Sequence, residues 1–216
     1  MRFEDQRDKL VKELQAGGIT DNNILKAFAK VPREDFVLPE YREYAYRNQP
    51  LPILHSQTIS QPLMIAIMMQ LMELKSTDVV LEVGTGSGYQ SALLAEIVKE
   101  VCSIERIESL SLAARKTLKK AGYSNIFYLI GDGHQGWKRA YPAHKTFEKI
   151  IVSAGAEEIP PALVQQLDEG GIMTIPVGSA GNQILHVIRK LNGEVLISHN
   201  GACSFVPLIN NDLPTR

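Results

Sequence analysis

The stretch Val79-Val-Leu-Glu-Val-Gly-Thr-Gly-Ser-Gly-Tyr89 decides the fold of this chain. A short apolar run breaks directly into three glycines at alternating positions, and a helical pattern begins at the tyrosine. Glycine lets the backbone turn sharply and approach a ligand closely, and a helix N-terminus offers backbone N–H groups. The stretch therefore predicts a buried strand, a glycine loop and a helix, which form the first unit of an α/β sheet.

Strand and helix patterns alternate through the rest of the chain. The expected strands span residues 79–83, 101–105, 126–130, 149–153 and 171–175. The expected helices of this region span residues 62–74, 89–99, 108–121 and 160–167. This alternation predicts a parallel sheet with helices on both faces. Three later β-like runs, 183–191, 194–198 and 204–208, predict an antiparallel C-terminal edge.

Residues 1–61 are expected to form a small helical N-terminal extension that acts as a lid over cofactor and substrate. Helices are expected at 3–16, ended by Gly17-Gly18, and at 21–30. An irregular stretch with several prolines then leads to the main domain, 62–216, and we expect the two parts to form one compact unit.

The spacing of the glycines distinguishes between two kinds of cofactor. A dinucleotide fingerprint is G-x-G-x-x-G, whereas Gly84, Gly86 and Gly88 give G-x-G-x-G after the acid Glu82. An adjacent carboxylate would repel a pyrophosphate, but it can attract the sulfonium and α-ammonium groups of S-adenosylmethionine. The loop therefore favours S-adenosylmethionine, with S-adenosylhomocysteine as product, on the Rossmann-like sheet of an S-adenosylmethionine-dependent methyltransferase.

Two further acids follow the next two expected strands. Glu105 can accept both ribose hydroxyls, and Asp132, in Gly131-Asp-Gly133, can accept the adenine amino group. Structural readings stay open for each feature: the glycine loop and Gly-Asp-Gly can be turns, and Glu105 can pair at the surface. Their order at successive strand ends favours a cofactor site at the carboxyl edge of the sheet.

Charge and cysteine content exclude several classes of function. The net charge of −1 leaves no basic excess for a phosphate backbone, so no nucleic-acid partner is expected. Cys102 and Cys203 are far apart and belong to no CxxC pair or Cys/His cluster, so no metal is expected. The N-terminus is charged and predicts neither a signal peptide nor a membrane span. We expect a cytoplasmic monomer.

Ser60, in Gln57-Thr-Ile-Ser-Gln-Pro62, directly precedes the third expected helix. The structural interpretation is a helix N-cap, with Pro62 in the first turn. A helix N-terminus also attracts carboxylates, so a serine there can both cap the helix and offer its hydroxyl to an anionic substrate. The two interpretations are compatible.

The segments described above, together with those named below, resemble the protein-L-isoaspartate O-methyltransferase family over nearly the whole chain. The glycine loop is generic to methyltransferases, whereas Thr-Ile-Ser-Gln-Pro and Phe-Val-Pro-Leu are much more specific to this family. The matching segments are Val31-Pro-Arg-Glu-Asp-Phe-Val37, Leu51-Pro-Ile53, Gln57-Thr-Ile-Ser-Gln-Pro62, Leu81-Glu-Val-Gly-Thr-Gly-Ser-Gly-Tyr89, Cys102-Ser-Ile-Glu-Arg106, Gly131-Asp-Gly133, Glu169-Gly-Gly171, Pro176-Val-Gly178 and Phe205-Val-Pro-Leu208.

The resemblance implies methylation of the free carboxyl of L-isoaspartyl residues in damaged proteins and peptides. The methyl ester closes to a succinimide, which can reopen to aspartate. Ser60 would be the active-site serine, and Val206 and Leu208 would line the substrate peptide. The cofactor-binding residues it implies are Ile53, Gln57, Thr58, Ile59, Glu82, Gly84, Gly86, Gly88, Glu105, Asp132 and Gly133. One departure is Ser56, at a position where many family members have glycine.

The expected chemistry requires little beyond positioning. A carboxylate with a pKa near ~4 is ionised at neutral pH, so no strong general base is needed. Ser60 would hold it by a hydrogen bond, and residues 203–208 would accept the peptide as an added strand. A NAD-dependent oxidoreductase, a methyltransferase for nucleic acids or small molecules, and a non-catalytic cofactor-binding module are the alternatives.

Overall fold

A seven-stranded sheet forms the centre of the molecule, with strand order β5-β4-β3-β6-β7-β8-β9. The structure is a computed structural model that describes residues 2–210. The strands are β3 (Val79–Val83), β4 (Glu100–Glu105), β5 (Ile126–Ile130), β6 (Phe147–Val152), β7 (Leu167–Ser179), β8 (Asn182–Leu191) and β9 (Glu194–Cys203). Strands β5, β4, β3, β6 and β7 are mutually parallel. Strands β8 and β9 continue the sheet in antiparallel pairing. The predicted parallel sheet with an antiparallel C-terminal edge is confirmed.

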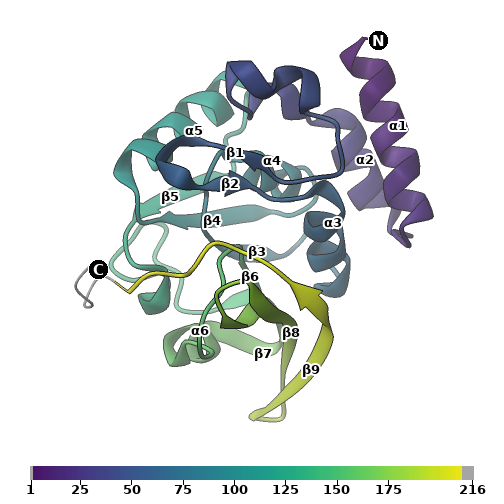
Figure 1. Ribbon diagram of the computed structural model, residues 1–216. Coiled ribbons are helices and arrows are strands. Elements are labelled where there is room, and N and C mark those ends of the chain that lie inside the picture. The colour runs from purple at the N-terminus through teal and green to yellow at the C-terminus, as the bar shows by residue number, and fades with distance from the viewer. Residues whose placement is uncertain (1, 211–216) are drawn as a thin grey trace.

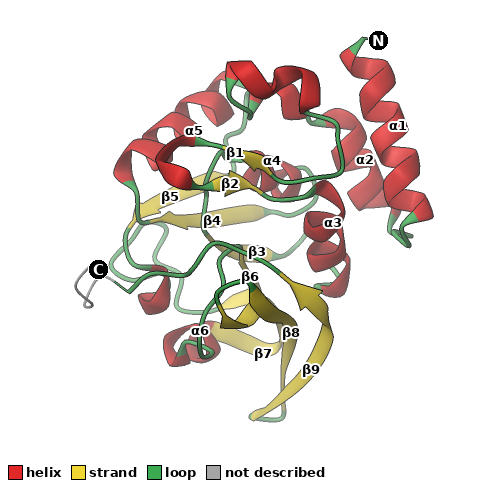
Figure 2. Ribbon diagram, in the orientation of Figure 1, coloured by secondary structure: helices red, strands yellow, loops and turns green. Residues whose placement is uncertain are grey.

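Helices cover both faces of this sheet, as the sequence predicts (Figure 2). One apolar cluster joins one face of the strands to α3 (Pro62–Leu71), α4 (Tyr89–Ala95) and α5 (Glu108–Lys120). The other joins the opposite face to α6 (Pro161–Gln166) and the loop that carries Trp137. Strand β3 is buried at all five positions, which explains why its sequence is apolar rather than alternating. None of the helices within residues 2–210 is long and apolar enough to cross a membrane.

The N-terminal extension contains more regular structure than the sequence predicts. It consists of helices α1 (Phe3–Ala16) and α2 (Asn22–Lys30), 3-10 turns η1 (Arg33–Asp35), η2 (Pro39–Tyr44) and η3 (Leu54–Ser56), and an antiparallel ribbon of β1 (Leu51–Pro52) and β2 (Thr58–Ile59). Asp21 caps α2 by accepting hydrogen bonds from two backbone amides. Helices α1 and α2 share the apolar cluster of α3 and α4, so the extension packs directly against the sheet domain (Figure 1).

Residues 204–208 differ from the expectation of a strand. Within this fully described segment, the only pairing is an isolated bridge between Gly155 and Pro207. The backbone of Gly155 donates to Val206 at 2.8 Å and accepts from Leu208 at 2.7 Å. Pro207 has no N–H for a longer ladder, and the segment crosses the carboxyl ends of β3 and β6 instead of extending the sheet (Figure 1).

Candidate active site

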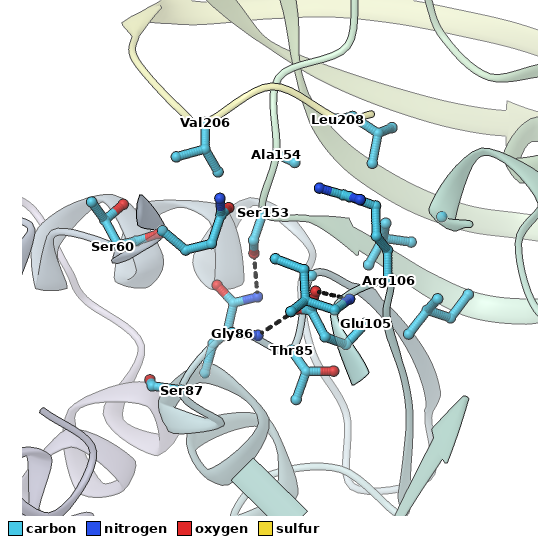
Figure 3. Close-up of a pocket in the computed structure, with 18 of the residues that line it drawn as sticks. Ser60, Thr85, Gly86, Ser87, Glu105, Arg106, Ser153, Ala154, Val206 and Leu208 are labelled. Carbon is cyan, nitrogen blue, oxygen red and sulfur yellow. Dashed lines mark hydrogen bonds between the residues drawn. The ribbon is translucent and has the colours of Figure 1, made fainter. Parts of the chain in front are cut away.

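A cavity opens where the carboxyl ends of β3, β4 and β6 meet, at the point where the strand order reverses (Figure 3). Open α/β sheets bind ligands at such a point, because loops from neighbouring strands diverge there. Its walls come from the β1–β2 ribbon, the glycine loop, the ends of β4 and β5, and residues 206–209. The sequence-predicted residues that line it are Gln57, Thr58, Ile59, Ser60, Gly84, Gly86, Glu105, Gly133, Val206 and Leu208.

The three glycines of the loop have different roles. Gly84 and Gly86 line the cavity, with φ angles of +98° and +53°, so the bare backbone forms the wall at both positions. Gly88 begins α4 at a φ of +88°, and a Cβ there would lie 3.0 Å from Leu118 of α5. Gly88 therefore permits close packing of α4 on α5 and is not among the lining residues.

Glu105 holds the glycine loop and faces the cavity at the same time (Figure 3). One carboxylate oxygen accepts the amide of Gly86 at 2.9 Å, and the other accepts the amide of Ile107 at 3.0 Å. Each oxygen has further lone pairs, so the carboxylate can still accept hydroxyl donors from a ligand. This geometry suits a ribose with two adjacent hydroxyls.

Glu82 does not take the position expected from the sequence. Its side chain is fully buried beneath the loop and accepts hydrogen bonds from Ser103 at 2.6 Å, from Ser91 and from Gln90 at 3.1 Å. Burial raises the pKa of Glu82 to about 7, although these hydrogen bonds oppose the shift. The expectation that Glu82 attracts a ligand cation directly is therefore wrong. Gln90 lies between Glu82 and the cavity; it lines the cavity and also donates to Ser153 at 2.7 Å.

Asp132 is not among the residues that line the cavity. It begins the 3-10 turn η4 (Gly133–Gln135) and accepts hydrogen bonds from the backbone and ring nitrogens of His134, at 2.9 and 3.0 Å. Its neighbours Gly131 and Gly133 line the cavity instead, and a Cβ on Gly133 would collide with Val83. Asp132 thus supports the turn interpretation of Gly-Asp-Gly, whereas Gly131 and Gly133 support the cofactor interpretation.

Ser60 follows β2 and lines the cavity, but it does not cap α3. The N-cap residue is Gln61, and Asn48 from the extension accepts the amide of Leu63 at 3.0 Å in place of a cap side chain. The N-cap interpretation of Ser60 is therefore wrong. In Figure 3, Ser60 and Val206 lie on one side of the cavity, and Arg106 and Leu208 lie on the other.

The ribbon loop next to Ser60 has an unusual backbone. His55 and Ser56 both have positive φ angles, +59° and +55°, a region that favours glycine. The His55 ring lies 2.6 Å from the hydroxyl of Ser109 at the start of α5, so the loop is fastened to that helix. Ile53 lies just behind the glycine loop, 3.7 Å from a Cβ built on Gly86.

A second cavity adjoins the first. Four residues line both: Thr58, Ser60, Ser153 and Val206. The second cavity continues along residues 202–205 at the end of β9. Gln183 fixes this strip by hydrogen-bonding both backbone groups of Phe205, at 2.7 and 3.2 Å, and a Cβ on Gly155 would collide with that amide. The two cavities therefore share one wall.

Arg33 is one of the residues of this region that sequence reasoning missed. It is fully buried and donates hydrogen bonds to the backbone carbonyls of Ala45, of Gln49 at 3.3 Å and of Ser60 at 3.0 Å. Burial lowers its pKa to about 10, which still leaves the guanidinium charged at neutral pH. No pattern in residues 32–37 signals this role. Gln90, Arg106 and Gln183 were missed for the same reason.

The lining residues fit S-adenosylmethionine. Bare backbone at Gly84 and Gly86, the carboxylate of Glu105 and the apolar side chains of Ile107 and Leu208 together suit hydroxyl groups and an aromatic base. The glycine loop itself carries no basic side chain for a pyrophosphate.

Comparisons of sequence point to one group of enzymes. The family described as protein-L-isoaspartate(D-aspartate) O-methyltransferase matches residues 5–213. The protein-L-isoaspartate O-methyltransferase of Petrotoga mobilis is 48% identical over 97% of this chain and 98% of its own length. That of Dictyoglomus turgidum is 45% identical over 96% of this chain and 92% of its own length.

Comparisons of structure agree. One solved protein-L-isoaspartate O-methyltransferase superposes with a TM-score of 0.85 at 26% identity, over 95% of this chain and 66% of that chain. Another, from Plasmodium falciparum in complex with S-adenosyl-L-homocysteine, gives a TM-score of 0.82 at 27% identity, over 94% of this chain and 98% of that chain. Both likenesses extend over the sheet and the N-terminal extension.

Proposed function

The chain belongs to the protein-L-isoaspartate(D-aspartate) O-methyltransferase family, and from this premise we propose how its residues perform the reaction. It transfers a methyl group from S-adenosyl-L-methionine to the free carboxyl of L-isoaspartyl residues in damaged proteins, which initiates their repair or turnover. S-adenosylmethionine supplies an electrophilic methyl group and remains as S-adenosylhomocysteine. Membership of this family argues against the alternatives of an oxidoreductase, a nucleic-acid methyltransferase and a non-catalytic module.

We assign cofactor binding to the cavity lined by the glycine loop. Gly84 and Gly86 present bare backbone, and Glu105 accepts the ribose hydroxyls while it keeps the loop in place. Gly133 provides a side-chain-free wall for the adenine, with the backbone around Asp132 beside it. Ile53, Gln57, Thr58 and Ile59 close the site from the ribbon. Glu82 and Gly88 contribute indirectly, through Gln90 and through helix packing.

We assign substrate positioning to Ser60. The single observation that carries this assignment is that Ser60 lines both cavities, at the wall that the cofactor site shares with the second site. A hydroxyl there can donate a hydrogen bond to the substrate carboxylate and hold one oxygen toward the cofactor. The carboxylate is already ionised at neutral pH, so the residue does not need to remove a proton.

We propose that the peptide backbone lies along the second cavity, beside Val206, with Leu208 at the far side of the opening. Gln183 and Gly155 hold this segment by its main chain, which leaves its side chains to contact the peptide. Recognition through main chain and small contacts suits an enzyme that meets damaged sites in many sequences. The earlier expectation of an added edge strand does not carry over, because residues 204–208 are not an edge of the sheet.

The activity is tested by methyl transfer from labelled S-adenosylmethionine to an isoaspartyl peptide, with the matched aspartyl peptide as control. We expect labelling of the isoaspartyl peptide alone. Equal labelling of both peptides would contradict the specificity, and labelling of neither would contradict the activity.

We further propose that the enzyme works as a cytoplasmic monomer without a nucleic-acid partner. The overall charge of −1 argues against a nucleic-acid partner, and the two free cysteines suit a reducing compartment. Light scattering coupled to size exclusion tests the oligomeric state, and a mass of two chains would contradict it.

A further inference from the structure

The N-terminal end of β4 carries a group of side chains that the methyl transfer does not use. Glu100, Cys102 and His144 each offer one ligand atom, and these three atoms lie within 4.8 Å of one another. Glu105, at the other end of the same strand, belongs to the cofactor site. Five residues of strand separate the two ends by about 16 Å, so this group is distinct from the active site.

The fold holds these three residues together firmly. Glu100 and Cys102 are two positions apart on a strand, so both side chains point to the same face. His144 comes from the loop between β5 and β6. That loop is fixed by hydrogen bonds to Pro142 from the Trp137 ring at 2.8 Å and from the His144 amide at 2.9 Å. The His144 ring also packs edge-on against Phe147, with centroids 5.8 Å apart.

The spacing of the ligand atoms is close to that of a tetrahedral metal site. Bonds of about 2.3 Å from zinc to sulfur and about 2.0 Å to nitrogen or oxygen place neighbouring ligand atoms roughly 3.5 Å apart. The Cys102 sulfur already lies 3.7 Å from a Glu100 oxygen, and that oxygen is hydrogen-bonded to the His144 ring. A cation can replace the hydrogen bond between Glu100 and His144 if these two side chains move apart only slightly.

We propose that Glu100, Cys102 and His144 form a binding site for a divalent cation of the zinc type. One thiolate, one carboxylate and a neutral imidazole balance two positive charges, which a half-buried site requires. The side chains of Glu100 and His144 are 18% and 29% exposed, so a water molecule can complete the coordination from the solvent side. The bound cation would link the loop that carries His144 to the start of β4. No sequence pattern signals the site, since its ligands lie in two separate segments and show no metal-ligand spacing.

Titration of the metal-free enzyme with Co²⁺ tests the proposal. A thiolate ligand gives Co²⁺ an intense charge-transfer absorption that oxygen and nitrogen ligands do not give. We expect this band to saturate at one Co²⁺ per chain, to vanish in Cys102→Ser and to need at least about 10-fold more Co²⁺ in His144→Gln. Cys203→Ser, which removes the other thiol, is the matched control and should keep the full band.

Thermal unfolding gives an independent readout with Zn²⁺. At about 100 times Kd, we expect Zn²⁺ to raise Tm by roughly 5–10 °C in the wild type and in Cys203→Ser, but not in His144→Gln. Absence of the cobalt band in the wild type, its retention in Cys102→Ser, or its loss in Cys203→Ser would overturn the proposal. If Cys102→Ser fails to fold, His144→Gln decides, because His144 is partly exposed and equal Co²⁺ affinity there would also overturn it.

Discussion

The guanidinium of Arg33 donates a hydrogen bond to the backbone carbonyl of Ser60, 3.0 Å away. Arg33 belongs to the N-terminal extension, so this bond fixes the segment that carries Ser60. The same guanidinium also binds the carbonyls of Ala45 and Gln49 and lies 5.5 Å from the centre of the Tyr89 ring. The extension therefore holds in place a segment that lines the cavity.

Replacing Arg33 should destabilise the enzyme. Arg33→Met leaves three carbonyls without their donor, and we expect the free energy of unfolding to fall by about 3 kcal/mol. Arg189→Met is the control, because it breaks a partly exposed ion pair with Glu73 and should cost less than about 1 kcal/mol. Urea denaturation measures both. Equal losses in the two variants would contradict the role of Arg33.

Ser56 should be a source of backbone strain. At a φ of +55° a residue with a side chain is strained by about 1–2 kcal/mol in the folded state. Replacement by glycine removes this strain, but part of the gain is offset by the larger entropy of glycine in the unfolded chain. We therefore expect Ser56→Gly to stabilise the fold by up to about 1 kcal/mol. Ser76→Gly, in a turn without positive φ, should be neutral or destabilising. Chemical denaturation of both variants checks this, and destabilisation by Ser56→Gly would refute the strain.

The buried carboxyl of Glu82 should make stability depend on pH. Its pKa is raised to about 7, above its unfolded value, so the folded state binds more protons than the unfolded state between roughly pH 4.5 and 7. Its stabilising effect is complete below this window and is lost as the pH rises through 7. Glu82→Gln removes the titration, so its unfolding free energy relative to wild type should increase by up to about 3 kcal/mol from pH 5 to 7.5.

Urea denaturation at the two pH values measures this difference. Glu40→Gln makes the same change in net charge on an exposed side chain and serves as the control. A difference between Glu82→Gln and wild type that falls with rising pH would show that the sign is wrong.

Glu105 should account for a large part of cofactor affinity. Glu105→Gln removes a charged acceptor and loosens the loop at Gly86, so we expect the Kd for S-adenosylhomocysteine to rise about 10- to 100-fold. Glu108→Gln, three residues later on the exposed side of α5, should leave it unchanged. Calorimetric titration distinguishes the two, and normal affinity in Glu105→Gln would exclude the ribose role.

Local sequence patterns predict much of this fold but not the orientation of individual side chains. The strand at 79–83, the glycine loop and the acid Glu105 depend on short-range chemistry, and all three lie as expected. Glu82 follows the same pattern, yet strand alternation turns its carboxyl beneath the loop, where Ser91 and Ser103 satisfy it. Whether a strand-end acid faces the ligand depends on which face of the strand it occupies, and one sequence does not show that.

Contacts between distant segments were not predictable from patterns. Ser60 precedes a helix and reads as its cap, but Asn48 takes that role from the extension. Residues 204–208 have β-forming composition, but Gly155 and Gln183 bind their backbone and direct them across the sheet. Arg33 has no local signal at all. These features depend on pairs of residues that only the folded chain brings together.

We propose that Ser60 positions the substrate carboxylate and leaves cofactor binding to other residues. The most direct measurement compares Ser60→Ala with wild type in kcat/KM for an isoaspartyl peptide and in Kd for S-adenosylhomocysteine. We expect a loss of about 10- to 100-fold in kcat/KM, with little change in Kd, and partial retention of activity in Ser60→Thr, which keeps a hydroxyl. Unchanged turnover in Ser60→Ala, or a loss of cofactor affinity as large as the loss of turnover, would contradict it.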